Sequence, residues 1–301
     1  TAIEKLRAYT IKDNVPFGEH DWSALANEWD AEQLAEWGLD LPVDFNAETN
    51  EGLTDPDEVP EVPETPITVL GDVWVMGKHR VLCGSCTDPD QVSNLMGAVY
   101  PDLIHTDPPY GMSAVSKSGV LSKSYGTDIL GDDSPDVAKD AFTLIHSLYP
   151  DAKHIWWGAN YYSSILPDSE CWLVWDKDNG QSDQTDCELA WANFRSVVRQ
   201  FTMASEKTNR VHPTQKPVAL MEWIIKRFKL TSHTIADYFG GSGSTLIAAE
   251  RNGITGYIME LDPRFVDVIV KRWQDFTGQQ AIHEASGKTF TELAEAQLTT
   301  V

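Results

Sequence analysis

The sequence predicts an α/β fold, a mostly parallel twisted sheet with helices on both faces. The chief observation is that, from Ile67 onward, short apolar runs alternate with segments of helical periodicity, as they do in β–α–β units. A chain of 301 residues, 42% hydrophobic and 23% charged, is also long enough to bury a large core without covalent staples. Four cysteines are too few for a disulfide scaffold, and the sequence contains no secretory signal or long apolar span.

The strands are predicted from short apolar runs bounded by turn residues. In chain order these runs are 73–76, 80–84, 102–107, 154–158, 171–177, 188–194, 234–239 and 255–261. Helical periodicity predicts helices at 89–97, 134–150, 216–229, 244–253 and 262–278. Ser134 with Pro135, and Asp262 with Pro263, are typical helix starts, while Gly253 and Gly278 are typical ends. Ser286 and Gly287 predict the turn of a hairpin near the C-terminus.

Composition divides the chain into four parts. We expect a small helical segment over 1–42, an acidic Pro-rich linker over 43–66, the main domain over 67–285 and a tail over 286–301. The net charge of −23 argues against a polyanionic partner, but the charge is unevenly distributed. Residues 1–66 hold 17 acids and 3 bases, whereas residues 194–230 hold 8 bases and 2 acids. The second stretch therefore predicts a locally basic face.

A glycine-rich turn at 239–243 lies between a predicted strand and a predicted helix. Such a turn lets the backbone approach a ligand closely, although a plain tight turn is the alternative. Its spacing fits neither a P-loop nor a dinucleotide fingerprint. Glu260 ends the following strand, where an acid can hold the hydroxyls of a ribose, and Asp237 adds a second acid. Together they indicate a nucleoside-containing cofactor without a pyrophosphate.

The segment "DLIHTDPPYGM", residues 102–112, places an acid and two prolines at the end of a strand. Asp107 lies at the carboxyl end of that strand, where open α/β sheets bind ligands. Pro108 and Pro109 make the backbone rigid and lack N–H donors, so their carbonyls are left as acceptors. Tyr110 offers a flat ring. These residues suit a planar base with an exocyclic amine, and a simple strand-ending turn is the alternative.

Three motifs in one order, "DPPY", "HPTQKP" and "DYFGGSGST", resemble those of the DNA amino-methyltransferases, in the arrangement of their beta group. The resemblance covers about residues 67–285. It implies a Rossmann-like S-adenosylmethionine-dependent methyltransferase fold and methyl transfer to the N6 amine of adenine or the N4 amine of cytosine. It also implies S-adenosylmethionine as the cofactor, DNA as the partner, a target base flipped out of the duplex and no metal.

The resemblance assigns roles to individual residues. Asp107 and the Pro108 carbonyl would hold the target amine, with Pro109 stiffening the turn and Tyr110 stacking on the base. The predicted cofactor-binding residues are Ser85, Cys86, Asp107, Thr214, Lys216, Asp237, Phe239, Gly241, Ser242, Gly243, Ser244 and Glu260. In this set Thr214 and Lys216 would lie by the methionine part and Glu260 on the ribose. Ser85 stands in "LCGSC" where the family has an acid near the adenine of the cofactor.

An aspartate at the head of the proline turn is more usual in adenine enzymes of this family. Asp107 therefore favours transfer to N6 of adenine. Transfer to N4 of cytosine stays open, and so does a catalytically silent nucleic-acid-binding module. A related turn headed by asparagine serves methylation of protein glutamine, which Asp107 disfavours.

The predicted DNA contacts are basic residues on either side of the catalytic turn. They are Lys117, Lys123, Arg195, Arg199, Lys207 and Arg210. A polar segment at 111–133 is expected to close over the flipped base, and a short target-recognition region is expected within 111–211. Cys83 and Cys86 form a CxxC, but Cys171 and Cys187 do not make the matching pair of a zinc site, so no metal is predicted.

The remaining expectations concern the setting of the protein. The cysteine usage and the family resemblance predict the cytoplasm of a bacterial or phage-infected cell, without a membrane partner. A homodimer stays open. The stretch "LRAYTIKDN" resembles the end of a ParB-like nuclease domain, which suggests the methylase part of a fusion, or an associated nuclease-like domain.

Overall fold

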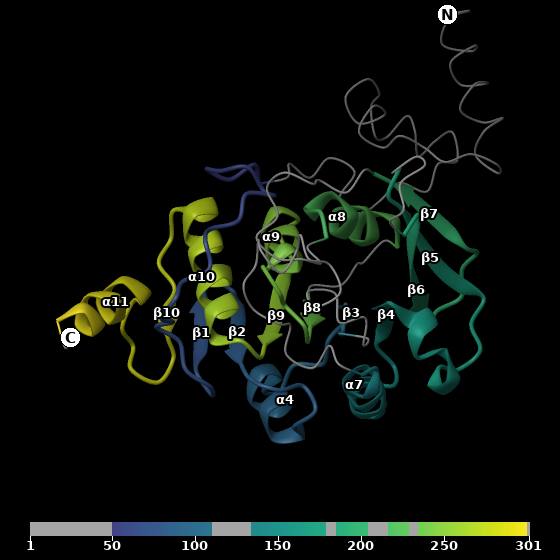
Figure 1. The fold of residues 1–301 in the computed structure, drawn as a ribbon, viewed down its shortest axis with the longest axis horizontal. Coiled ribbons are helices and arrows are strands. Elements are labelled where there is room, and N and C mark those ends of the chain that lie inside the picture. The colour runs from purple at the N-terminus through teal and green to yellow at the C-terminus, as the bar shows by residue number, and fades with distance from the viewer. Residues whose placement is uncertain (1–49, 110–133, 179–184, 204–215, 229–233, 300–301) are drawn as a thin grey trace, which may run out of the picture.

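The computed structural model describes residues 50–109, 134–178, 185–203, 216–228 and 234–299. Its centre is a ten-stranded sheet in the order β10-β1-β2-β9-β8-β3-β4-β6-β5-β7 (Figure 1). The strands are β1 Val73–Met76, β2 His79–Cys83, β3 Leu103–Thr106, β4 Lys153–Trp157, β5 Cys171–Asp176, β6 Cys187–Ala192, β7 Arg199–Thr202, β8 Thr234–Asp237, β9 Thr255–Glu260 and β10 Ile282–His283. Every strand predicted from the sequence is present.

The middle of the sheet is parallel. Strands β2, β9, β8, β3 and β4 run in one direction, and β7 is parallel to β5. The pairs β10–β1, β1–β2, β4–β6 and β6–β5 are antiparallel. The fold is therefore α/β with a mostly parallel mixed sheet, and the carboxyl ends of its central strands lie along one edge, where ligands bind in such folds.

Helices cover both faces of the sheet (Figure 1). On one face α4 (Pro89–Met96) and α7 (Asp136–Leu148) pack on a buried cluster that includes Ile104 and Trp156. On the other face α8 (Val218–Arg227), α9 (Ser244–Arg251) and α10 (Pro263–Thr277) pack on clusters that include Leu103 and Trp157. Neighbouring residues of one strand thus point into opposite layers, because successive side chains of a strand alternate.

Three local features differ from the sequence prediction. Strand β7 was not predicted, because its four residues "RQFT" are partly exposed at an outer edge of the sheet and carry little apolar signal. Helix α7 begins at Asp136 with Pro135 as its N-cap, so the N-cap lies one residue after the predicted Ser134. The C-terminal turn is followed by a helix, α11 (Phe290–Leu298), that a capping box of Thr289 and Glu292 opens. Short 3-10 turns occur at Ala159–Tyr161 and Ser163–Ile165.

The chain outside the predicted domain limits also contacts the core. The N–H of Leu53 donates to the carbonyl of Phe276 at 2.8 Å, and the N–H of Asn50 donates to that of Arg251 at 3.0 Å. Phe290 of α11 is buried against α10. The predicted helical segment 1–42 and the start of the predicted linker lie outside the described residues. Within the described part of the chain, no helix is long and apolar enough to span a membrane.

Candidate active site at the carboxyl ends of the central strands

The catalytic turn predicted from "DPPY" begins directly after β3. All four residues of β3 are buried, and Asp107 follows them with its side chain only 17% exposed. Pro108 is buried and Pro109 partly buried. Since β3 lies between β8 and β4, Asp107 stands in the middle of the ligand-binding edge.

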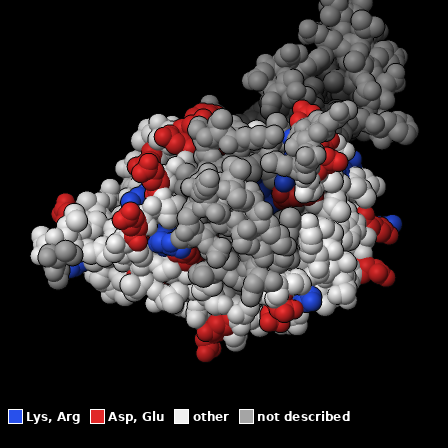
Figure 2. All heavy atoms as spheres, viewed as in Figure 1, with Lys and Arg blue, Asp and Glu red and all other residues white. Residues whose placement is uncertain are grey.

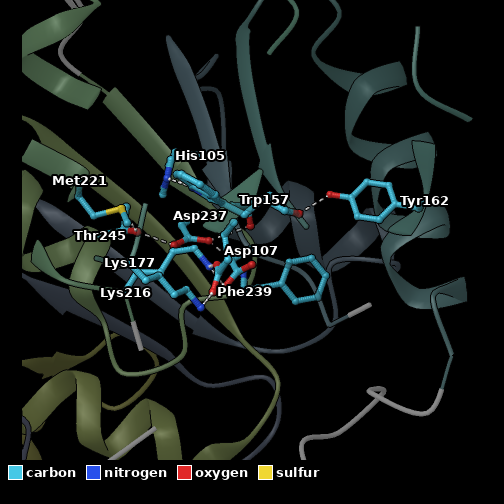
Figure 3. A network of polar contacts seen from close by, with 12 residues as sticks. His105, Asp107, Trp157, Tyr162, Lys177, Lys216, Met221, Asp237, Phe239 and Thr245 are labelled. Carbon is cyan, nitrogen blue, oxygen red and sulfur yellow. Dashed lines mark hydrogen bonds and ion pairs between the residues drawn. The ribbon is translucent and has the colours of Figure 1, made fainter. Parts of the chain in front are cut away.

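The two carboxylate oxygens of Asp107 have different surroundings (Figure 3). Its Oδ2 accepts a hydrogen bond and ion pair from the Nζ of Lys216. Its Oδ1 is buried and has no hydrogen-bond partner among the described residues. A buried acceptor without a partner is costly, so Oδ1 is placed to receive a donor from a ligand.

Lys216 belongs to a buried group of alternating charges. Its Nζ lies 2.8 Å from Glu188 on β6, and Glu188 also pairs with Lys177. The same Nζ lies 5.3 Å from the centroid of the Trp157 ring, within cation–π range. Burial opposes the charge of Lys216, but the two carboxylates outweigh burial and raise its pKa. Lys216 is therefore a permanent cation at neutral pH, held between two acids.

The pKa of Asp107 is raised above its ordinary value. Burial is the largest cause, because the ionised carboxylate loses contact with water. Lys216 works in the opposite direction and Glu188 reinforces the rise. The result is a carboxylate of greater basicity than an exposed aspartate.

Asp237, which ends β8, uses its carboxylate inside the protein. Its Oδ1 accepts from the Thr106 hydroxyl at 2.8 Å and from the N–H of Phe239 at 3.1 Å, and its Oδ2 accepts from the Thr245 hydroxyl at 2.6 Å. Burial raises its pKa to about 6. Asp237 thus connects the end of β3, the glycine-rich turn and the first turn of α9, which fixes the relative position of the two ligand-bearing loops.

The glycine-rich turn closes on Glu260 at the end of β9. The N–H of Gly241 donates to Glu260 Oε2 at 2.8 Å, and the N–H of Asp262 donates to Oε1 at 2.9 Å. Burial raises the pKa of Glu260 to about 7. A Cβ added to Gly240 would lie 2.4 Å from Ile258, so this turn needs a glycine to approach the strand. Gly243, at φ 87°, precedes α9, and no side chain caps that helix.

The residues between β2 and α4 lie beside the same edge. The N–H of Ser85 donates to the side chain of Gln91 at 2.7 Å, and its hydroxyl lies 2.8 Å from that of Thr87. Cys86 is buried in the core cluster, against which Phe239 also packs. Burial raises the pKa of Cys86, so its thiol stays protonated.

The structure brings together most of the predicted site that it describes. The turn after β3, Lys216, the glycine-rich turn and Glu260 lie at one edge of the sheet. Tyr110, Thr214 and segment 111–133 fall outside the described residues, as do Lys117, Lys123, Lys207 and Arg210. Arg199 lies on the outermost strand, and the exposed Arg195 lies 3.6 Å from Glu170.

Sequence reasoning missed Glu188, which pairs with Lys216, and Lys177, which pairs with Glu188. Lys177 follows β5 and Glu188 lies on β6, so each was seen only as a residue at the end of an apolar run. Charges beside such runs are a weak signal, and nothing in the sequence pairs them with a lysine in "HPTQKP". Within the described ranges, no cluster of three or more His, Cys, Asp or Glu could hold a metal ion.

The parallel sheet, the glycine-rich turn against Glu260 and the polar turn after β3 define a Rossmann-like methyltransferase fold. Residues 151–271 match the family model N6_N4_Mtase, described as DNA methylase. This part of the chain is thus similar to the DNA methylases of the amino-methyltransferase family, which act on N6 or N4 amines with S-adenosylmethionine as methyl donor.

Solved structures of DNA methyltransferases are similar to this chain. One is the complex of M1.HpyAVI with S-adenosylmethionine, 20% identical, with a TM-score of 0.43, covering 64% of this chain and 98% of that chain. Another is the PvuII DNA methyltransferase, named as cytosine-N4-specific, 15% identical, with a TM-score of 0.46, covering 71% of this chain and 90% of that chain. No curated protein matches the chain.

Proposed function

We propose that this protein transfers a methyl group from S-adenosylmethionine to the exocyclic N6 amine of adenine in DNA. The observation that carries the proposal is the asymmetry of Asp107, whose Oδ2 is held by Lys216 while Oδ1 is buried without a described partner. An amine that enters this turn can donate one N–H to Oδ1. The neighbouring Pro108 carbonyl is the second acceptor that we propose for it.

The reaction needs an acceptor because the target amine is a poor nucleophile. Its lone pair is delocalised into the ring, and hydrogen bonds to two acceptors favour a more tetrahedral nitrogen with a localised lone pair. The bound cofactor supplies an electrophilic methyl group. Methylation leaves an extra proton on the nitrogen, and the raised pKa of Asp107 suits it to take that proton at Oδ1. A fixed, largely water-excluded turn supplies orientation and electrostatics in advance.

The residues at the neighbouring strand ends fit S-adenosylmethionine. Glu260 keeps lone pairs beyond its two backbone hydrogen bonds and is partly exposed, so it can accept from two ribose hydroxyls. The glycine-rich turn allows close approach of the cofactor, and the uncapped start of α9 presents N–H donors. We propose that Ser85, Phe239 and Gly241 also line the cofactor site. Lys216 instead holds the catalytic carboxylate of Asp107 in place.

The choice of adenine rests on the aspartate at the head of the turn, which is more usual in the adenine enzymes of this family. The described residues suit any exocyclic amine, so N4 of cytosine is the second candidate. Incubation of unmethylated DNA with labelled S-adenosylmethionine, followed by digestion to nucleosides, tests the proposal. We expect label in N6-methyladenine. Label confined to N4-methylcytosine would refute the adenine assignment, and absence of label in any nucleoside would refute DNA methylation.

DNA contacts outside the turn are proposed from charge. On the face shown in Figure 2, acidic side chains lie at several places along the periphery and basic side chains are fewer. Basic residues are therefore the candidates for contacts with the negatively charged phosphates. We propose that Lys117, Lys123, Arg195, Arg199, Lys207 and Arg210 contact phosphates. DNA affinity should then fall steeply with salt, by roughly one power of the salt concentration for each phosphate contact. Affinity that does not change with salt would contradict this proposal.

A further inference from the structure

We propose that Glu188 and Lys177 are positioning residues that set, through Lys216, how strongly Asp107 accepts the target amine. The inference rests on the proposed function and adds that the β5–β6 hairpin tunes the acceptor strength of Asp107. Neither residue touches Asp107 in the described structure, so each acts through Lys216 and through its own charge.

The hairpin geometry brings the two residues together. Strands β5 and β6 are antiparallel, with Trp175 opposite Glu188, and the N–H of Lys177 donates to the carbonyl of Asp186 at 3.0 Å. Lys177 Nζ pairs with Glu188 Oε1 and lies 5.1 Å from the centroid of the Trp175 ring. Glu188 Oε2 then faces Lys216 at 2.8 Å. Both side chains of the hairpin pair are 17% exposed, so water screens the pair weakly.

The four charges form a chain in which signs alternate from Lys177 through Glu188 and Lys216 to Asp107. Lys216 divides its positive charge between two carboxylates, so Asp107 receives only part of it. If the charge of Glu188 were removed, Lys216 would form an ion pair with Asp107 alone. The stronger pairing would make Asp107 a weaker hydrogen-bond acceptor for the amine. Removing the charge of Lys177 would act in the opposite direction, because one cation near Asp107 is lost.

The same arrangement of charges sets the direction in which the pKa of Asp107 is displaced. Burial raises its pKa most, Lys216 lowers it, Glu188 raises it and Lys177 lowers it. Among the residues that the structure describes, the other titratable groups near Asp107 include His105, Tyr162 and Asp237.

Two of these neighbours stay neutral over the useful range. Burial lowers the pKa of His105 to about 3, and its Nε2 accepts from the indole of Trp157 at 2.7 Å. Burial raises the pKa of Tyr162 well above its ordinary value. Asp237 titrates at about 6, but its surroundings are unchanged by substitutions on the hairpin, so it contributes equally to every variant.

The test measures single-turnover methyl transfer to DNA at saturating S-adenosylmethionine, from about pH 5 to about pH 9. The variants are Glu188→Gln and Lys177→Met, and Glu295→Gln serves as the control, because Glu295 is an exposed acid on α11, away from the site. We expect Glu188→Gln to move the acid limb of the profile to lower pH and to reduce the plateau rate roughly 10-fold to 100-fold. We expect Lys177→Met to move the acid limb to higher pH, and the control to follow the wild type.

Displacements of the acid limb in opposite directions separate this role from a structural one. A loss of packing or folding would lower the rate without moving the acid limb of either variant. S-adenosylmethionine affinity should stay within about threefold of wild type in both variants, because the hairpin does not reach Glu260. The inference would be overturned if the acid limbs of both variants coincided with that of the wild type, or if both moved in the same direction. In that case methyl transfer by the wild type would still support the proposed function. A wild type that transfers no methyl group would overturn both. If Glu188→Gln does not fold, the direction seen with Lys177→Met decides alone.

Discussion

Asp57 allows a prediction whose size can be worked from the structure. Helix α8 begins at Val218 after Pro217, and no side chain within the helix start caps it. Instead Asp57 Oδ1, from the segment before the domain, accepts the N–H of Val218 at 2.8 Å. Arg272, which is buried, donates to the carbonyl of Pro56 at 2.6 Å and to that of Ser242 in the glycine-rich turn at 2.8 Å. The segment around Asp57 therefore contacts the start of α8 directly and the glycine-rich turn through Arg272.

Two substitutions separate the hydrogen bond of Asp57 from its charge. Asp57→Ala removes both, whereas Asp57→Asn keeps an acceptor oxygen and removes only the charge. Loss of an N-terminal cap costs about 1 kcal/mol, so Asp57→Ala should be less stable than Asp57→Asn by about that amount. Asp57→Asn should itself be less stable than the wild type. Burial lowers the pKa of Arg272 to about 10, and of the charges that oppose this effect Asp57 has the strongest influence.

Urea unfolding at neutral pH measures these differences, with Glu58→Ala as the control for loss of an exposed neighbouring acid. A difference of 1 kcal/mol corresponds to about 2–4 °C in Tm for a domain of this size, which gives an independent readout. The control should stay within about 0.5 kcal/mol of wild type. Equal stability of Asp57→Ala and Asp57→Asn would refute the capping of α8 by this segment.

Three further predictions concern single groups. Lys216→Met should abolish most methyl transfer and lower the free energy of unfolding by about 3–5 kcal/mol, because it leaves Asp107 and Glu188 buried without their shared cation; urea unfolding and single-turnover assays check both effects. S-adenosylmethionine should bind more tightly as pH rises through about 7, where Glu260 ionises, and calorimetric titration should show Glu260→Gln binding weakly with a flatter pH dependence. A hydrogen bond from His79 lowers the pKa of Glu250 to about 2 from 4.5, so its contribution to stability is complete above about 4.5 and is lost as pH falls toward 2. The stability gap between wild type and Glu250→Gln should therefore shrink over that window, and a gap that stays constant would contradict the assignment.

The sequence predicted the central layers of the fold well, because their signals are local. Each core strand is a short apolar run, and helices such as α10 carry their own boundaries in Asp262, Pro263 and Gly278. The position of Asp107 at a strand end also followed from the sequence, since the apolar run of β3 stops there. Such features need no knowledge of what packs against them.

The parts that sequence reasoning missed depend on contacts between distant residues. Nothing local connects Lys216 with Asp107 and Glu188, which come from separate strands. Asp237 was predicted beside the cofactor, and only the structure shows that it also accepts hydrogen bonds from three donors of the protein. Asp57 stands in an acidic Pro-rich stretch predicted as a linker, and only the fold reveals that it meets the start of α8.

The role of Asp107 is the central claim, and Asp107→Ala tests it most directly. The measurement is the single-turnover rate of methyl transfer to DNA, taken together with S-adenosylmethionine affinity on the same protein. Loss of the acceptor at Oδ1 should lower the rate by roughly 10²-fold to 10⁴-fold, while affinity for the cofactor changes by no more than about threefold. A variant that binds the cofactor and methylates DNA within about tenfold of the wild-type rate would contradict the account.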